Sequence, residues 1–283
     1  MKCKAIVVES PSNFSYKEFN IGDIPRDEVP ISPVFSSICQ TDRHIIDGSL
    51  LYYSTGEAKY PIITGHEWVG YFHKTPVVGM CILSDEDRRV EVGVVNRHGA
   101  HSDILFMPQK YIFEVPSMEY KYALVEPLAV SVRGFNRLGL SGAENIIING
   151  FGSIGRMFGR VLDYYGLKYD IYDMSISDSE PNWSHYNVIV ECSGAVGVLE
   201  KFTRCVGCKI LLYGLRYDSI DMGRFVSNEN NIITSLGAYA DDFRRAIEIM
   251  DRSKIDRGEC DFYVLEDFSK ALKCKRKVIF EHV

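Results

Sequence analysis

The chain has 283 residues, enough for one large domain or two, and its 46% hydrophobic content is ordinary for a soluble globular protein. A net charge of −6, with no Lys/Arg cluster beyond residues 273–277, disfavours nucleic-acid binding. No apolar run approaches the roughly 20 residues of a membrane span, no signal-peptide pattern precedes the first strand, and eight scattered cysteines favour a reducing cytoplasm.

The first 120 or so residues are expected to be rich in β-strands. A strand is predicted at 4–8, and the apolar runs 77–83 and 104–107 alternate with Gly, Pro and Asp turns. Residues 120–138 are predicted to be helical. Glu126 directly precedes Pro127, so its backbone is expected to stay out of that helix. This pattern favours a compact, barrel-like domain.

From Asn145 onward, strands and helices are expected to alternate. Strands are predicted at 146–148, 170–173, 188–190 and 209–213, with a helix at 154–165. Such alternation predicts an α/β domain with a doubly wound parallel sheet. The tail is predicted to hold a helix at 243–250 and a final strand at 277–280.

A glycine-rich turn follows the first strand of this predicted sheet. Gly150 would allow a tight turn, Gly152 the close approach of a pyrophosphate, and Gly155 the packing of a helix on the sheet. The helix would begin at Ile154, and the backbone amides of Ser153 and Ile154 would bind the phosphates. The turn therefore predicts a dinucleotide site.

Asp173 is the candidate residue for binding the adenosine ribose of the cofactor. It ends the next predicted strand, 18 residues after Gly155, where a carboxylate would bond the ribose hydroxyls of NAD. The alternative is an ordinary turn residue at a strand end. Arg156 is the nearest cation in sequence for a 2′-phosphate, so NAD is expected with some tolerance of NADP.

Four residues supply the groups that would hold a catalytic zinc with one position open, namely Cys39, His66, Glu67 and Glu126. Each also has a structural alternative: a buried thiol, a core histidine, a carboxylate bonded to a ligand, and a helix-capping carboxylate. Neighbouring side chains on a strand point to opposite faces, so His66 and Glu67 share an ion only if the backbone bends near Gly65.

Other polar residues are assigned supporting or structural roles. Asp42 is expected to orient the metal ligands. His101 and Asp103 are expected at the surface. Cys205 and Cys208 have the spacing of a metal or redox motif, but no second pair accompanies them, and a structural role is favoured.

Five strings occur in the order found in the zinc-dependent medium-chain dehydrogenases, the alcohol dehydrogenase superfamily, which the chain resembles over nearly its whole length. They are residues 4–8, 65–67, 126–130, 150–155 and 211–214. The polyol, sugar and threonine dehydrogenase branch is the most similar in motif. Two features depart from the family: the lobe with four cysteines for a structural zinc is absent, and the chain is shorter, mainly between Gly70 and Ala100.

The resemblance implies a GroES-like catalytic domain at 1–138 and 239–283 and a Rossmann NAD-binding domain at 139–238. It implies one catalytic zinc, with Glu126 either a ligand or a partner of the metal's water, and it places Gly214 in the cofactor site. Thr41 stands where the family's hydroxyl accepts the alcohol proton. His44 stands where several members, though not all, pass that proton to solvent. A homo-oligomer, dimer or tetramer, is also implied.

The sequence therefore predicts a zinc-dependent oxidoreductase that transfers a hydride from a secondary alcohol to NAD. The substrate would be a small polyol, sugar or hydroxy-amino acid, with no nucleic-acid or membrane partner. Two alternatives stay open. One is an aldose 1-dehydrogenase acting at the anomeric carbon; the other is a catalytically silent dinucleotide-binding protein that metal stabilises.

Overall fold

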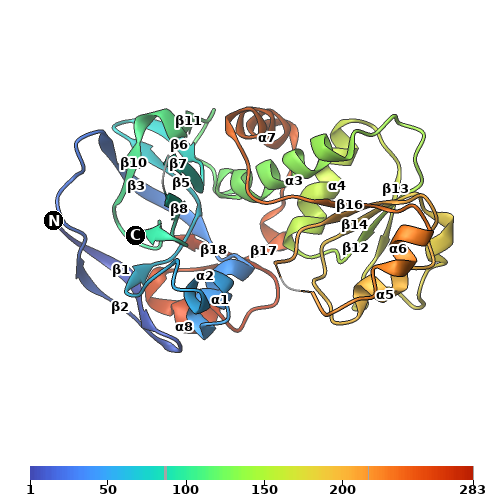
Figure 1. Ribbon diagram of the computed structural model, residues 1–283. Coiled ribbons are helices and arrows are strands. Elements are labelled where there is room, and N and C mark those ends of the chain that lie inside the picture. Colours follow the sequence, from blue (N-terminus) through green and yellow to red (C-terminus); the bar gives the residue numbers. More distant parts are fainter. Residues whose placement is uncertain (86–87, 216, 283) are drawn as a thin grey trace. The chain divides into compact units, whose positions relative to one another are not determined.

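The computed structural model describes residues 1–85, 88–215 and 217–282, and the chain divides between two units (Figure 1). The first unit is Met1–Ala129 with Ala238–Val283, and the second is Val130–Gly237. The first boundary falls inside helix α3 (Val125–Leu138), before the expected division after residue 138. In the part of the chain that the structure describes, no helix has the length and apolar character needed to cross a membrane.

The first unit is built mostly of β-strands. They are β1 (Lys2–Ser10), β2 (Asn13–Asn20), β3 (Glu28–Ser37), β4 (Ile62–Ile63), β5 (Glu67–Phe72), β6 (Thr75–Gly79), β7 (Ile82–Asp85), β8 (Arg88–Val92), β9 (Asn96–Arg97), β10 (Leu105–Pro108), β11 (Ile112–Glu114), β17 (Cys260–Tyr263) and β18 (Lys277–Glu281). They form three sheets. The strand order is β2-β1-β4 in the first, β11-β6-β5-β3-β18-β17 in the second, where β10 also pairs with β3, and β7-β8-β9 in the third. The run 77–83 thus contributes to two strands rather than one, because the chain changes sheets after Gly79.

Short helices connect these strands. The α-helices are α1 (Gln40–Asp47), α2 (Leu51–Ser54), α7 (Ala240–Arg252) and α8 (Phe268–Ala271); the 3-10 helices are η1 (Gln109–Tyr111), η2 (Tyr120–Leu124), η4 (Arg257–Glu259) and η5 (Leu265–Asp267). Helix α1 buries Ile45 and Ile46 in a core that also contains Phe268 and Phe280. That burial anchors the helix whose N-cap residue is Cys39.

The start of α3 differs from the expectation for Glu126. The helix begins at Val125, so Glu126 and Pro127 both lie within its first turn. Proline is tolerated there because the first amides of a helix have no acceptor within the helix. The prediction that the Glu126 backbone stays out of the helix is therefore wrong.

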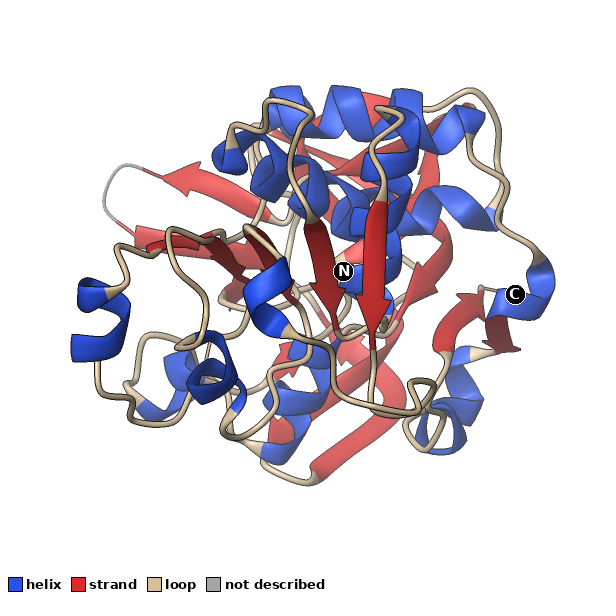
Figure 2. Ribbon diagram, turned by 90° about the vertical axis from the view of Figure 1, so that its right-hand side faces the viewer, coloured by secondary structure: helices blue, strands red, loops and turns tan. Residues whose placement is uncertain are grey.

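The second unit is a parallel sheet with helices (Figure 2). Its elements are β12 (Ile146–Asn149), α4 (Ser153–Tyr164), β13 (Tyr169–Tyr172), η3 (Trp183–His185), β14 (Val188–Glu191), α5 (Val198–Phe202), β15 (Lys209–Leu212), α6 (Gly223–Ser227) and β16 (Asn231–Thr234). The strand order is β13-β12-β14-β15-β16, and every pair is parallel. The predicted parallel sheet is confirmed.

Apolar side chains cover both faces of this sheet. Ile148 packs with Phe158 and Leu162 of α4 in one cluster, whereas Ile147 packs with Phe202 of α5 in another. The order also reverses at β12, which is joined through α4 to β13 on one side and pairs with β14 on the other. In such sheets ligands bind at the carboxyl ends of the strands where the order reverses, which is where Gly150 follows β12.

Candidate functional site

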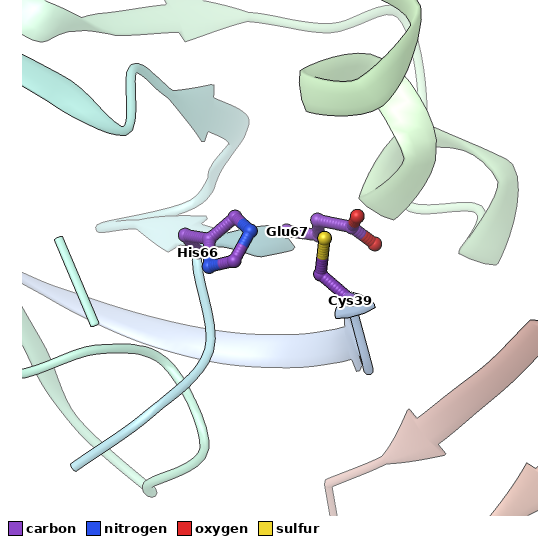
Figure 3. Close-up of side chains that lie close together, drawn as sticks. All are labelled: Cys39, His66 and Glu67. Carbon is purple, nitrogen blue, oxygen red and sulfur yellow. The ribbon is translucent and has the colours of Figure 1, made fainter. Parts of the chain in front are cut away.

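Cys39, His66 and Glu67 form a cluster in the first unit. One potential ligand atom from each residue lies within 4.8 Å of the other two, a limit that exceeds the spacing around a tetrahedral zinc by only about 1 Å. Figure 3 shows the Cys39 sulfur between the His66 ring and the Glu67 carboxylate. Residues 39, 66 and 67 thus converge although 27 positions separate the first two.

Helix α1 sets the position of Cys39. Cys39 is the N-cap residue, and its backbone N–H donates to Asp42 Oδ2 at 2.7 Å. Asp42 is fully buried, and its other oxygen accepts from the Gly65 N–H at 3.0 Å and lies 3.8 Å from His66 Nδ1. One carboxylate therefore joins the segments that carry Cys39 and His66, and an orienting role of Asp42 toward a metal's ligands stays a prediction.

The backbone bends directly before His66. Gly65 has a φ of 97°, in the left-handed region that favours glycine, and Glu67 is the first residue of β5. His66 therefore lies outside the strand, and its side chain does not follow the alternation of side-chain directions along β5. This bend lets two adjacent side chains point into one cluster.

Glu67 is held from one side only. Its Oε2 accepts hydrogen bonds from Ser37 Oγ and from the part-buried ammonium of Lys277, while its buried Oε1 has no partner. Lys277 Nζ also donates to the Ile38 carbonyl at 3.0 Å. Burial alone would lower the pKa of Lys277, but Glu67 and Cys39 raise it, so the lysine is a fixed positive charge beside the cluster.

Glu126 lies near this cluster but outside the group of three. Its side chain is buried, and burial raises the pKa of the carboxyl to about 7, with His66 opposing and Glu67 reinforcing the rise. The structure therefore brings Cys39, His66 and Glu67 together and leaves Glu126 as a neighbouring acid.

The donor set fits a zinc ion. Glu67 Oε1 is buried without a hydrogen-bond partner, which costs free energy unless a ligand is present, whereas His66 Nδ1 lies beside Asp42. Burial would lower the pKa of His66, but Asp42, Cys39 and Glu126 raise it well above its usual value. This excess of negative charge, with thiolate, imidazole and carboxylate donors, matches the chemistry of zinc.

Thr41 and His44 lie on α1 beside the cluster. Thr41 Oγ1 is 3.8 Å from Cys39 Sγ. The His44 ring is part-exposed, with Nδ1 2.8 Å from Ser49 Oγ and Nε2 3.4 Å from the Gln40 amide nitrogen. The Thr41 hydroxyl thus lies beside the Cys39 sulfur, whereas the His44 imidazole reaches the solvent.

The glycine turn of the second unit has the backbone that its spacing predicts. Gly150 has a φ of 90°, and a Cβ there would lie 2.6 Å from the Ser193 nitrogen; a Cβ at Gly155 would lie 2.1 Å from the Gly150 carbonyl oxygen. Beside Gly152, by contrast, there is open space. Gly152 is the N-cap of α4 without a side-chain cap, so the amides of Ser153 and Ile154 are available to an anion.

Asp173 is tied to this glycine turn. Its Oδ2 accepts from the Phe151 N–H at 2.7 Å, and its Oδ1 accepts from Ser175. Burial would raise the pKa of Asp173, but the hydrogen bonds from Ser175 and Phe151 lower it. The carboxylate therefore carries a charge next to the turn. The Arg156 guanidinium lies 5.0 Å from the Phe151 ring centroid. Gly214, after β15, packs against Tyr217.

Replacing Asp173 by Ser together with Met174→Arg is expected to weaken NAD use and improve NADP use. Met174 is 73% exposed, so an arginine there has room to meet a 2′-phosphate, and the repulsive carboxylate is gone. The measurement is kcat/KM for both cofactors, with Met174→Gln as the uncharged control. An unchanged ratio, or a wild type that prefers NADP, would remove Asp173 from ribose recognition.

Four residues outside the metal candidates differ in environment. The expectation for His101 is wrong: it is fully buried against Phe268 and Phe280, because its two ring nitrogens are both satisfied within the core. Asp103 is exposed, as expected. Cys205 and Cys208 are buried, and their thiols donate to the Trp183 and Tyr186 carbonyls. Among the described residues they belong to no metal-binding group.

Comparison with known proteins points to dehydrogenases. No protein-family model matches the chain. It is 23% identical over 330 aligned residues to D-arabinitol dehydrogenase 1 of Uromyces fabae, covering 95% of this chain and 92% of that protein. It is also 23% identical over 312 aligned residues to a glucose 1-dehydrogenase of Metallosphaera sedula, covering 87% of each.

Solved structures of alcohol-handling enzymes share the fold. Acetophenone reductase from Geotrichum candidum, in complex with NAD, superposes with a TM-score of 0.86 at 14% identity, covering 99% of this chain and 97% of that one. The 2R,3R-butanediol dehydrogenase from Bacillus subtilis gives 0.81 at 18%, covering 99% of each. The protein thus has the mixed α/β fold with parallel strands of these dehydrogenases.

Proposed function

We propose that the protein is a zinc-dependent oxidoreductase that transfers a hydride from a secondary alcohol to NAD. The observation that carries the proposal is the Cys39, His66 and Glu67 cluster, in which the buried Glu67 Oε1 lacks a partner. The glycine turn of the second unit supports a dinucleotide, and similarity to an arabinitol dehydrogenase supports a polyol or sugar substrate. A hydroxy-amino acid remains within the proposed substrate class.

The chain's own residues bind the two groups and move a proton. When bound, zinc would polarise the alcohol oxygen and NAD would accept the hydride. Cys39, His66 and Glu67 would hold the metal, and Lys277 and Ser37 fix the Glu67 carboxylate. The Thr41 hydroxyl accepts the alcohol proton as it passes on its own, and part-exposed His44 gives that proton an exit to solvent. The amides at the start of α4 hold the cofactor phosphates.

Glu67 is proposed as the third ligand and Glu126 as a neighbour of the metal. We expect Glu126→Gln to lower zinc affinity or turnover about 10- to 100-fold, the usual scale for residues that support a ligand. Glu67→Gln is expected to cost more zinc affinity, because it removes a ligand charge. Zinc competition titrations measure both, with exposed Glu119→Gln as control. If Glu126→Gln changes only thermal stability, Glu126 is a helix-capping residue.

Two alternatives are distinguished by the same assay. Similarity to a glucose 1-dehydrogenase favours an aldose oxidised at its anomeric carbon as the second candidate. A catalytically silent dinucleotide-binding protein is the third. NAD reduction should be followed on a panel of polyols, aldoses and threonine with zinc-loaded protein. Polyol turnover supports the proposal, aldose turnover the second candidate, and tight NAD binding without turnover the third. The homo-oligomeric state and the cytoplasmic location remain predictions.

A further inference from the structure

His101 connects the two segments that carry Cys39 and His66. Its Nε2 lies 3.3 Å from the Ser37 carbonyl oxygen and its Nδ1 lies 2.9 Å from Thr64 Oγ1, both in buried surroundings. A carbonyl only accepts, so Nε2 carries the hydrogen and the Thr64 hydroxyl donates to Nδ1. The ring is therefore a neutral bridge with one defined tautomer.

Each end of this bridge lies two residues before a proposed metal ligand. Ser37 ends β3 shortly before Cys39, and Thr64 precedes Gly65 and His66. The backbone reinforces the second end, because the His101 N–H donates to the Thr64 carbonyl at 3.0 Å. A change in this bridge therefore acts on the spacing of the two ligands.

The surroundings leave the ring little freedom. Phe268 and Phe280 pack against it with ring centroids 5.3 Å away. On the other side a Cβ at Gly65 would lie 2.7 Å from His101 Cδ2, so the bend before His66 fits directly against the imidazole. The imidazole therefore bridges the two segments by hydrogen bonds and also packs directly against the backbone bend at Gly65.

We propose that His101 is a positioning residue of the metal site, which sets the separation of Cys39 from His66 and thereby the affinity and geometry of the bound ion. The proposal rests on the proposed function, since it requires that these residues bind zinc. In this role His101 is not itself a ligand. It orients the ligands indirectly, by fixing the two backbone segments that carry them.

The test compares His101→Phe with His101→Gln. Phenylalanine keeps the aromatic packing and removes both ring hydrogen bonds, whereas glutamine retains a donor and an acceptor. We expect zinc affinity to fall about 10- to 100-fold in His101→Phe, with a shifted visible absorption spectrum of the cobalt-substituted protein, and to recover largely in His101→Gln. Neither readout depends on turnover.

Two further variants keep the outcome decisive. Phe268→Leu loosens the packing on the same ring without removing its hydrogen bonds, so it should lower the unfolding temperature but leave the cobalt spectrum unchanged. Thr64→Val removes one hydroxyl and is the variant to use if His101→Phe does not fold; zinc affinity should fall roughly 2- to 10-fold, the effect of one hydrogen bond.

Three results would overturn the proposal. Wild-type affinity and spectrum in His101→Phe, or in Thr64→Val where that is the variant used, would leave His101 as core packing only. An equal loss of affinity in Phe268→Leu would lead to the same conclusion. A wild type that binds neither zinc nor cobalt would overturn the proposed function as well, so failure of the two proposals is told apart by the wild type.

Discussion

His66→Ala is expected to abolish zinc retention and to lower turnover by about three orders of magnitude or more, while NAD binding persists. Zinc supplies several kcal/mol of charge stabilisation to such reactions, and each 1.4 kcal/mol is about tenfold in rate. His66 belongs to the first unit and the glycine turn to the second, so NAD affinity should stay within about twofold, as for independent sites. Cys39→Ala should behave alike.

Metal analysis and NAD titration of the same preparations check this result. His73→Asn is the matched control, because His73 is an exposed histidine of the same unit with a φ of 53°, which asparagine tolerates. Near-normal metal content and activity in the His66 variant would show that the metal site has been assigned to the wrong residues.

Thr41→Val is expected to keep the zinc and to lower turnover by about two orders of magnitude or more, the scale of general acid–base effects. The variant preserves the shape of the side chain and removes the hydroxyl that lies 3.8 Å from Cys39 Sγ. Because Thr41 is not a proposed ligand, metal content separates this variant from His66→Ala.

Thr41→Ser is the control, since it restores a hydroxyl on a smaller side chain and should recover most of the rate. Steady-state kinetics on the best substrate of the panel, with zinc measured in parallel, give the comparison. A rate for Thr41→Val within a factor of about two of the wild type would take Thr41 out of the proton path, because acid–base groups contribute far more.

The parallel sheet could be predicted because its central strands are short, mostly apolar and bounded by turns. Ile146–Asn149 is buried at every position, as is typical of a parallel strand covered on both faces. Boundaries were less predictable at α3, where the local effect of Pro127 on Glu126 suggested a break. The helix instead absorbs the proline in its first turn, where no amide is needed.

The local motifs identified the cluster but not what holds it. Cys39, His66 and Glu67 are marked by residue type and by the glycine that allows the bend. Lys277 is 210 positions from Glu67 and reaches it only because β18 pairs with β3 beside Ser37. His101 likewise meets Ser37 and Thr64 through tertiary packing. Such partners depend on strand pairing, which no short string of the sequence encodes.

Zinc content measured together with NAD reduction tests the central claim most directly. The purified protein should hold about one zinc per chain, because one ligand cluster is present among the described residues and the four-cysteine lobe is absent from the sequence. Chelation should remove NAD-dependent alcohol oxidation, and added zinc should restore it. Unchanged oxidation in zinc-free protein, or a second zinc that survives mild chelation, would contradict the account.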